Sequence, residues 1–191
     1  MSQHVFVGMS GGVDSSVTAA LLLEQGYKVT GVFMKNWAQD LPGFKCPWRE
    51  DLADAKRVAV QLGIPFKIYD FQTEYKQKVV DYMIAEYEAG NTPNPDARVV
   101  ASEYGAELHM AVDDNKDQTY FLYRVTSEAL SQTLFPLGVL TKPEVRKNAA
   151  ELGLITAEKK DSVGICFVGE IGIKEFLQNF VTTEPGNVVE R

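Results

Sequence analysis

The chain has 191 residues, of which 45% are hydrophobic and 24% charged, the composition of a globular protein with room for a core. Its formal net charge of −7 argues against a broadly basic surface, so RNA contact would require a local patch or residues outside this sequence. Two cysteines, Cys46 and Cys166, are too few for a disulfide scaffold, and no apolar run reaches the length of a membrane span. We therefore expect a cytoplasmic protein with no membrane contact.

The first 26 residues predict a strand, a loop of small residues and a helix. Residues 5–7 are a short apolar run, and apolar residues return at helical spacing from Val17 until Gly26. Between them lies the glycine-rich loop, residues 8–16, with the sequence Gly-Met-Ser-Gly-Gly-Val-Asp-Ser-Ser. Free N–H groups at a helix N-terminus and glycines without Cβ atoms are typical of a phosphate-binding site. The alternative is a turn that only caps the helix, with Asp14 as an ordinary first-turn acid.

Strands and helices alternate further along the chain. Strands are expected over 27–33 and 64–71, and helices over 51–63 and 74–89. This alternation predicts an α/β fold with a doubly wound parallel sheet and helices on both faces. The apolar stripe of the last of these helices is expected in the core: Tyr75, Val79, Met83 and Tyr87.

The second half of the chain gives weaker strand signals and one clear helix start. Residues 99–100 and 108–112 carry the strand signals, and Thr141-Lys142-Pro143-Glu144 predicts a helix that begins with a capping box and ends at Gly153. Its outer face either is simply solvated or contacts a nucleic-acid backbone. The basic residues concerned are Lys142, Arg146, Lys147, Lys159 and Lys160.

The two cysteines and two polar segments are less informative on their own. Cys166 is either inert in the core or a thiol activated by nearby lysines, whereas Cys46 is expected to be structural. The segments 91–96 and 113–118, taken alone, indicate a proline-containing turn and a solvated helix cap.

The glycine-rich loop is neither of the common phosphate-binding loops, because no lysine follows its glycines and Gly-x-Gly-x-x-Gly spacing is absent. Ser-Gly-Gly-x-Asp-Ser-Ser instead resembles the PP-loop of the ATP pyrophosphatases. With four further segments, it resembles the tRNA-specific 2-thiouridylase (MnmA) family over nearly the whole chain. These segments are 33–37 (Phe-Met-Lys-Asn-Trp), 91–96 (Asn-Thr-Pro-Asn-Pro-Asp), 114–123 (Asp-Asn-Lys-Asp-Gln-Thr-Tyr-Phe-Leu-Tyr) and 159–169 (Lys-Lys-Asp-Ser-Val-Gly-Ile-Cys-Phe-Val-Gly).

The resemblance implies a tRNA-uridine 2-sulfurtransferase that thiolates the wobble uridine. ATP would adenylate the C2 oxygen of the base, and a cysteine persulfide sulfur would then attack C2. It also implies a Rossmann-like fold of the adenine nucleotide alpha hydrolase type over residues 1–132. A smaller, mostly helical tRNA-binding domain is expected over 133–191.

The resemblance also assigns roles to single residues. Cys166 would carry the persulfide, delivered by a sulfur-relay protein, and Asp96 would accept a proton. Mg²⁺ is expected with ATP, but no residue is assigned as a metal ligand. Met34 would lie against the adenine ring, although a core methionine is an equal alternative. The phosphate-binding residues would be Gly8, Met9, Ser10, Gly11, Gly12, Val13, Asp14 and Ser15. The residues that face the target base would be Asn94, Pro95 and Asp96. The residues that contact tRNA would be Lys116, Asp117 and Gln118.

The sequence departs from the family in two places. Val99 stands where the family has a second catalytic cysteine, and the family's Thr-Gly-His-Tyr segment is missing, so a stretch is expected to be absent between Asp96 and Ala97. The family's β-rich C-terminal part is expected to be missing from this sequence as well. Two other functions therefore remain open: a different PP-loop ATP pyrophosphatase acting on a small carbonyl substrate, and a catalytically inactive nucleotide-binding module.

Overall fold

The computed structural model describes residues 3–40, 46–81, 100–102, 105–113, 125–161 and 176–180. The chain divides into two compact units. The first unit draws on Met1–Met34, Arg49–Tyr69 and Pro93–Asp161, and the second on Lys35–Trp48, Asp70–Thr92 and Ser162–Arg191. This grouping differs from the expected boundary at residue 132, and the assignment of 133–191 to a tRNA-binding domain stays a prediction.

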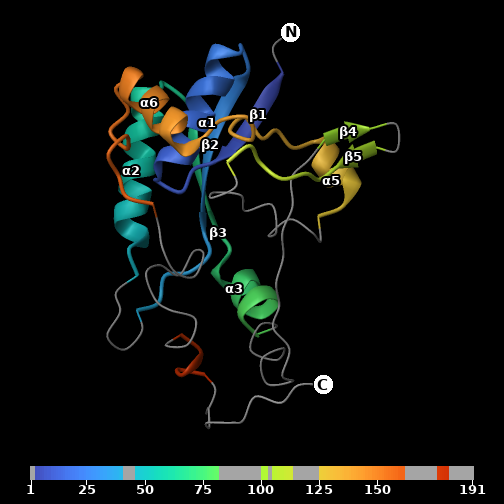
Figure 1. The fold of residues 1–191 in the computed structure, drawn as a ribbon. Coiled ribbons are helices and arrows are strands. Elements are labelled where there is room, and N and C mark those ends of the chain that lie inside the picture. Colours follow the sequence, from blue (N-terminus) through green and yellow to red (C-terminus); the bar gives the residue numbers. More distant parts are fainter. Residues whose placement is uncertain are drawn as a thin grey trace, which may run out of the picture. The chain divides into compact units, whose positions relative to one another are not determined.

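A three-stranded sheet carries the glycine-rich loop at the end of its first strand (Figure 1). The strands are β1 (His4–Gly8), β2 (Lys28–Lys35) and β3 (Phe66–Asp70), in that spatial order. β1 and β2 are parallel, with Val5 opposite Val29. The Gly31 N–H donates to the Pro65 carbonyl and the Phe71 N–H to the Lys35 carbonyl, so β3 runs in the same direction. The predicted α/β fold with a parallel sheet is therefore confirmed.

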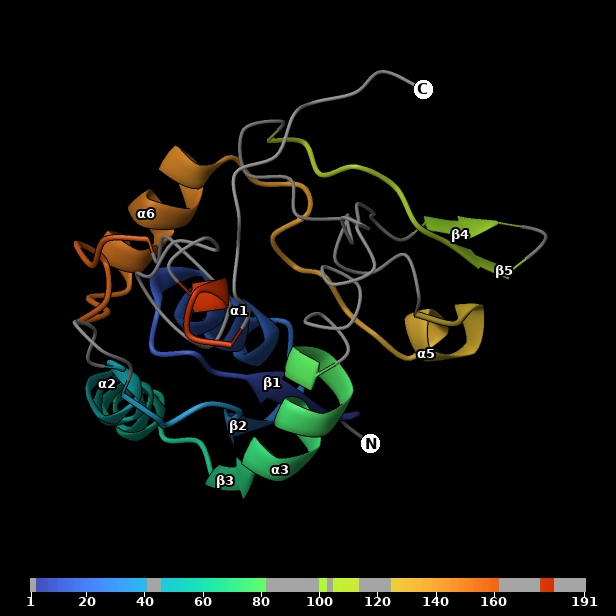
Figure 2. The same cartoon turned by 90° about the horizontal axis from the view of Figure 1, so that it is seen from below.

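Two helices pack on the same side of this sheet (Figure 2). They are α1 (Val13–Glu24), which connects β1 to β2, and α2 (Trp48–Gln61), which connects β2 to β3. Two right-handed crossovers between strands in this order place both helices on the same face. As predicted, α1 gives way to a turn at Gly26, whose φ of +86° suits glycine. The core side chains come from both helices and from alternate strand positions: Val7, Val17, Leu22, Val29, Phe33, Ala55, Val58 and Ala59.

Helix α6 (Lys142–Glu151) packs against α1 in the first unit. It starts as predicted: Glu144 accepts from the Thr141 N–H at 2.7 Å in a capping box. Val145 and Ala149 lie in the same core cluster as α1. Although α6 comes late in the sequence, it therefore contributes side chains to the core of the first unit.

The weaker signals are confirmed only in part. β4 (Val100–Ser102) and β5 (Gly105–Glu107) form an antiparallel hairpin, followed by α5 (Ser127–Ser131). Residues 108–112, where a strand was also predicted, are not in a strand. In the part of the chain that the structure describes, no helix is both long and apolar enough to cross a membrane.

In the second unit, α3 (Gln72–Tyr75) continues into a π-helical turn, η1 (Lys76–Val80). The stripe prediction is wrong at Val79, which is 43% exposed, whereas Val80 is 2% exposed. A π-helical turn holds more residues than an α-helical turn, so it moves the buried face on by one position. Val80 packs in a small cluster with Trp37, Cys46 and Phe176. Met83 and Tyr87 lie outside the described residues.

Candidate functional site

The glycine-rich loop is fixed at its start by Met9. The Met9 N–H donates to the Val32 carbonyl at 2.7 Å, and the side chain is only 2% exposed. Gly31 on β2 makes room for it, because a Cβ there would lie 2.5 Å from the Met9 sulfur. These contacts fix the direction in which the chain leaves the sheet. It leaves at the carboxyl edge, where ligands bind in open α/β folds.

Gly11 brings the loop into direct contact with helix α2. Its φ of +81° is the left-handed conformation that favours glycine. A Cβ on Gly11 would overlap the Asp51 carbonyl oxygen and lie 2.9 Å from the carbonyl carbon. No larger residue fits this position without a movement of the loop or of α2.

Serine hydroxyls surround the start of α1. Gly12 is the N-cap and provides no side-chain cap. The Ser10 hydroxyl accepts from the Gly12 N–H at 3.4 Å, and the Ser15 hydroxyl accepts from the Ser10 N–H at 3.2 Å. These bonds are long, so they can be exchanged for stronger bonds to an anion, whereas buried Ser16 donates to the Gly12 carbonyl at 2.7 Å. The first turn thus carries main-chain N–H groups and serine hydroxyls, the kinds of group that bind phosphate at helix N-termini.

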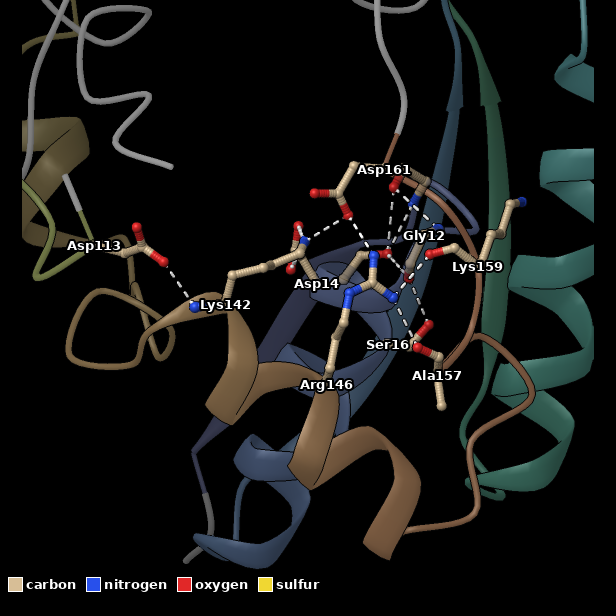
Figure 3. A network of polar contacts seen from close by, with 11 residues as sticks. Gly12, Asp14, Ser16, Asp113, Lys142, Arg146, Ala157, Lys159 and Asp161 are labelled. Carbon is tan, nitrogen blue, oxygen red and sulfur yellow. Dashed lines mark hydrogen bonds and ion pairs between the residues drawn. The ribbon is translucent and has the colours of Figure 1, made fainter. Parts of the chain in front are cut away.

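A lysine from α6 lies at the same helix start (Figure 3). The Lys142 Nζ is 2.7 Å from both carboxylate oxygens of Asp14 and 2.9 Å from Asp161 Oδ1. The Lys142 side chain is 13% exposed and that of Asp14 is 54% exposed. The residue that sequence analysis assigned to phosphate binding is therefore paired with a lysine 128 positions away, which no local pattern indicates.

Two other basic residues are held within the first unit. Arg146 donates to the carbonyls of Ala157 and Lys159 and pairs with Asp161 at 2.9 Å. The Lys159 Nζ lies 2.9 Å from Asp51 and 2.6 Å from Asp54. Burial disfavours the Lys159 charge, but these hydrogen bonds outweigh burial and raise its pKa.

The prediction that five basic side chains face outward is therefore wrong for three of them. Lys142, Arg146 and Lys159 point toward carboxylates of the same unit: Lys142 reaches Asp14 because α6 packs against α1, Arg146 pairs with Asp161, and Lys159 pairs with Asp51 and Asp54 of α2. Lys147 and Lys160 remain exposed, and Lys147 is 3.8 Å from Glu151.

The remaining predicted site residues divide into two groups. Met34 is 39% exposed, and its methyl group lies 3.7 Å from the position of a Cβ on Gly8, so it is beside the loop and outside the core. Cys46 is 6% exposed, as expected for a structural thiol. In the described ranges, no group of three or more His, Cys, Asp or Glu side chains could hold a metal ion. The residues outside the described ranges are Asn94, Pro95, Asp96, Lys116, Asp117, Gln118 and Cys166.

Comparison with known families tests the resemblance. Residues 3–102 and 97–170 match the family model described as "tRNA methyl transferase HUP domain". The chain belongs to this family. Curated proteins named tRNA-specific 2-thiouridylase MnmA are also similar to the chain. Those of Flavobacterium johnsoniae and Legionella pneumophila (strain Lens) are each 47% identical to the chain over 98% of its length. The recognition made from sequence motifs is therefore confirmed.

The chain spans 56% and 60% of the length of these two relatives. The alignments cover 223 and 217 positions although the chain has 191 residues, so the relatives carry additional residues inside the aligned region. The two stretches matched by the family model meet at residues 97–102. This agrees with the absence of a segment between Asp96 and Ala97.

A solved structure agrees with the fold alone. NMN synthetase from Francisella tularensis superposes on 94% of this chain and 73% of its own, with a TM-score of 0.50 and 16% sequence identity.

Proposed function

We propose that this chain provides the nucleotide-binding part of an ATP-dependent tRNA 2-thiouridylase that acts in the cytoplasm. The proposal is supported by family membership, by relatives named tRNA-specific 2-thiouridylase that align with 98% of the chain, and by the glycine-rich loop. The observation that carries it is the geometry of the glycine-rich loop: the left-handed backbone of Gly11 lies against α2, and the hydroxyls of Ser10 and Ser15 lie at the start of α1.

The described residues would hold ATP in the following way. Main-chain N–H groups of residues 10–15 and the hydroxyls of Ser10 and Ser15 would bind the phosphates, whereas the Met9 N–H is already bonded to the Val32 carbonyl. Exposed Met34 would contact adenine. ATP would adenylate the C2 oxygen of a uracil: the oxygen would attack the α-phosphorus and pyrophosphate would leave, so that the C2 oxygen could then depart as part of AMP. Mg²⁺ would accompany the phosphates as their counter-ion.

The sulfur step depends on residues outside the described ranges. We propose that Cys166 carries persulfide sulfur from a relay protein. The outer sulfur would attack C2 of the wobble uridine and expel AMP, and a second thiol would then break the S–S bond and form a disulfide with Cys166. In the family a second cysteine supplies that thiol, and Val99 stands at its position here, so this chain would need an added thiol. Asn94, Pro95 and Asp96 would face that base, with Asp96 as proton acceptor, and Lys116, Asp117 and Gln118 would contact tRNA. These roles come from the matching family segments.

The first experiment measures ATP binding by isothermal titration calorimetry. Ser10→Ala should weaken ATP binding about tenfold, because a hydrogen bond to a charged group is lost. Ser131→Ala is the matched control, since this hydroxyl only donates to the Glu128 carbonyl within α5. Failure of the unmodified chain to bind ATP would refute the proposal.

A second experiment separates the proposed activity from its alternatives. The chain is incubated with ATP, a tRNA transcript and a persulfide donor, and 2-thiouridine and AMP are measured by mass spectrometry. Thiolation that is lost in Cys166→Ser supports the proposal. AMP release without tRNA indicates a small carbonyl substrate, and ATP binding without product indicates an inactive module, consistent with Val99 in place of a cysteine.

A further inference from the structure

The glycine-rich loop contains no lysine or arginine between residues 8 and 16. A triphosphate carries several negative charges, and the common Walker loop meets them with a lysine that directly follows its glycines. Here the first turn of α1 instead carries Asp14, whose negative charge would repel a phosphate at close range. Besides the Mg²⁺ proposed above, a cation from elsewhere in the chain would offset these charges.

Lys142 can provide this cation. Its ammonium group is 2.7 Å from both oxygens of Asp14, and therefore lies at the first turn of α1 (Figure 3). Its main chain is fixed as well, because the Lys142 N–H donates to Asp113 at 2.8 Å. The adjacent capping box holds the start of α6 in place. Only 13% of the side chain is exposed, so little conformational freedom remains to be lost when an anion binds.

The two carboxylates beside Lys142 differ in freedom. Asp161 also receives a 2.9 Å bond from Arg146 and is 28% exposed. Asp14 is 54% exposed, so its carboxylate can turn into water and leave one side of the ammonium group for another anion. Asp161 would meanwhile keep Lys142 in place.

We propose that Lys142 is a phosphate-binding residue of the nucleotide site. Its ammonium group exchanges the Asp14 carboxylate for a phosphate oxygen of ATP. This inference rests on the proposed function, because it requires ATP at the glycine-rich loop. It also moves Lys142 from the predicted tRNA-contacting face to the nucleotide.

The test measures binding of ATP and of adenosine by calorimetry. Lys142→Met should weaken ATP binding about tenfold or more and leave adenosine binding unchanged, because only ATP carries phosphates. Lys147→Met is the matched control: it lies on the same helix, is 73% exposed, and should bind both ligands as the unmodified chain does. Thermal unfolding of each variant, followed by circular dichroism, verifies folding. Lys142→Gln, which keeps a hydrogen-bond donor but not the charge, should show the same loss and replaces the Met variant if that variant does not fold.

A double-variant comparison separates direct contact from mere neutralisation of Asp14. If Lys142 contacts phosphate, Lys142→Met weakens ATP binding in an Asp14→Asn background as well. Disappearance of the loss in that background would overturn the inference, as would an equal loss for adenosine or unchanged ATP binding in Lys142→Met. Absence of ATP binding by the unmodified chain would overturn both this inference and the proposed function. The other results leave the proposed function intact.

Discussion

Replacing Gly11 by alanine tests the contact between the glycine-rich loop and α2. Two costs add at this position. A non-glycine residue in the left-handed conformation costs about 1–2 kcal/mol. The new Cβ would also overlap the Asp51 carbonyl oxygen and lie 3.0 Å from the Asp51 Cα, both backbone atoms that cannot rotate away. Overpacking of this kind costs about 1–3 kcal/mol, so we expect Gly11→Ala to lose about 2–5 kcal/mol of unfolding free energy.

Gly26→Ala provides the matched control. Its φ of +86° is nearly that of Gly11 at +81°, but no atom lies within 4 Å of the Cβ position. It should therefore lose only the conformational cost of about 1–2 kcal/mol. Urea unfolding followed by circular dichroism gives both free energies, and calorimetry should show that Gly11→Ala alone weakens ATP binding. Equal losses of stability in the two variants would refute the proposed contact with Asp51.

Lys159 makes stability dependent on alkaline pH, because hydrogen bonds to two aspartates outweigh burial and raise its pKa. The stabilisation by Lys159 is complete below the ordinary lysine pKa of about 10.4 and is lost as pH rises through the raised pKa. Lys159→Met should therefore reduce the loss of unfolding free energy at alkaline pH. An unchanged alkaline dependence of the unfolding free energy would contradict this role of Lys159. Hydrogen bonds from Thr141 lower the pKa of Glu144, whose contribution is present above the ordinary glutamate value and lost as pH falls through the lowered one. Glu144→Gln should therefore reduce the acid dependence of α6 helicity, measured by circular dichroism, and an identical acid titration would argue against the capping box. In a Cys166→Ser variant, the Cys46 thiol should react with a thiol reagent only after denaturation, since it is 6% exposed; rapid reaction of the folded variant would disprove its burial.

Local signals predicted the strand, loop and helix around residues 8–16 and the capping box at Thr141. In both cases neighbouring residues determine the structure: glycines permit the turn, and Thr141 and Glu144 bond to each other's main chain or side chain. The family match then confirmed the recognition that these local motifs had suggested.

The remaining features depend on contacts that no local pattern contains. The pair between Lys142 and Asp14 exists because α6 packs on α1, and the sequence alone suggested an outward-facing lysine. The approach of Gly11 to Asp51 depends in the same way on how α2 docks. The exchange of Val79 for Val80 as the buried residue follows from a π-helical turn, which helical periodicity does not reveal.

The pair between Asp14 and Lys142 also sets an order of events during synthesis of the chain. Asp14 leaves the ribosome early, but its cation is encoded 128 residues later. At typical elongation rates this delay lasts about 6–26 seconds, far longer than a helix needs to form. A nascent chain therefore exposes a glycine-rich loop with uncompensated negative charge until α6 has emerged and docked.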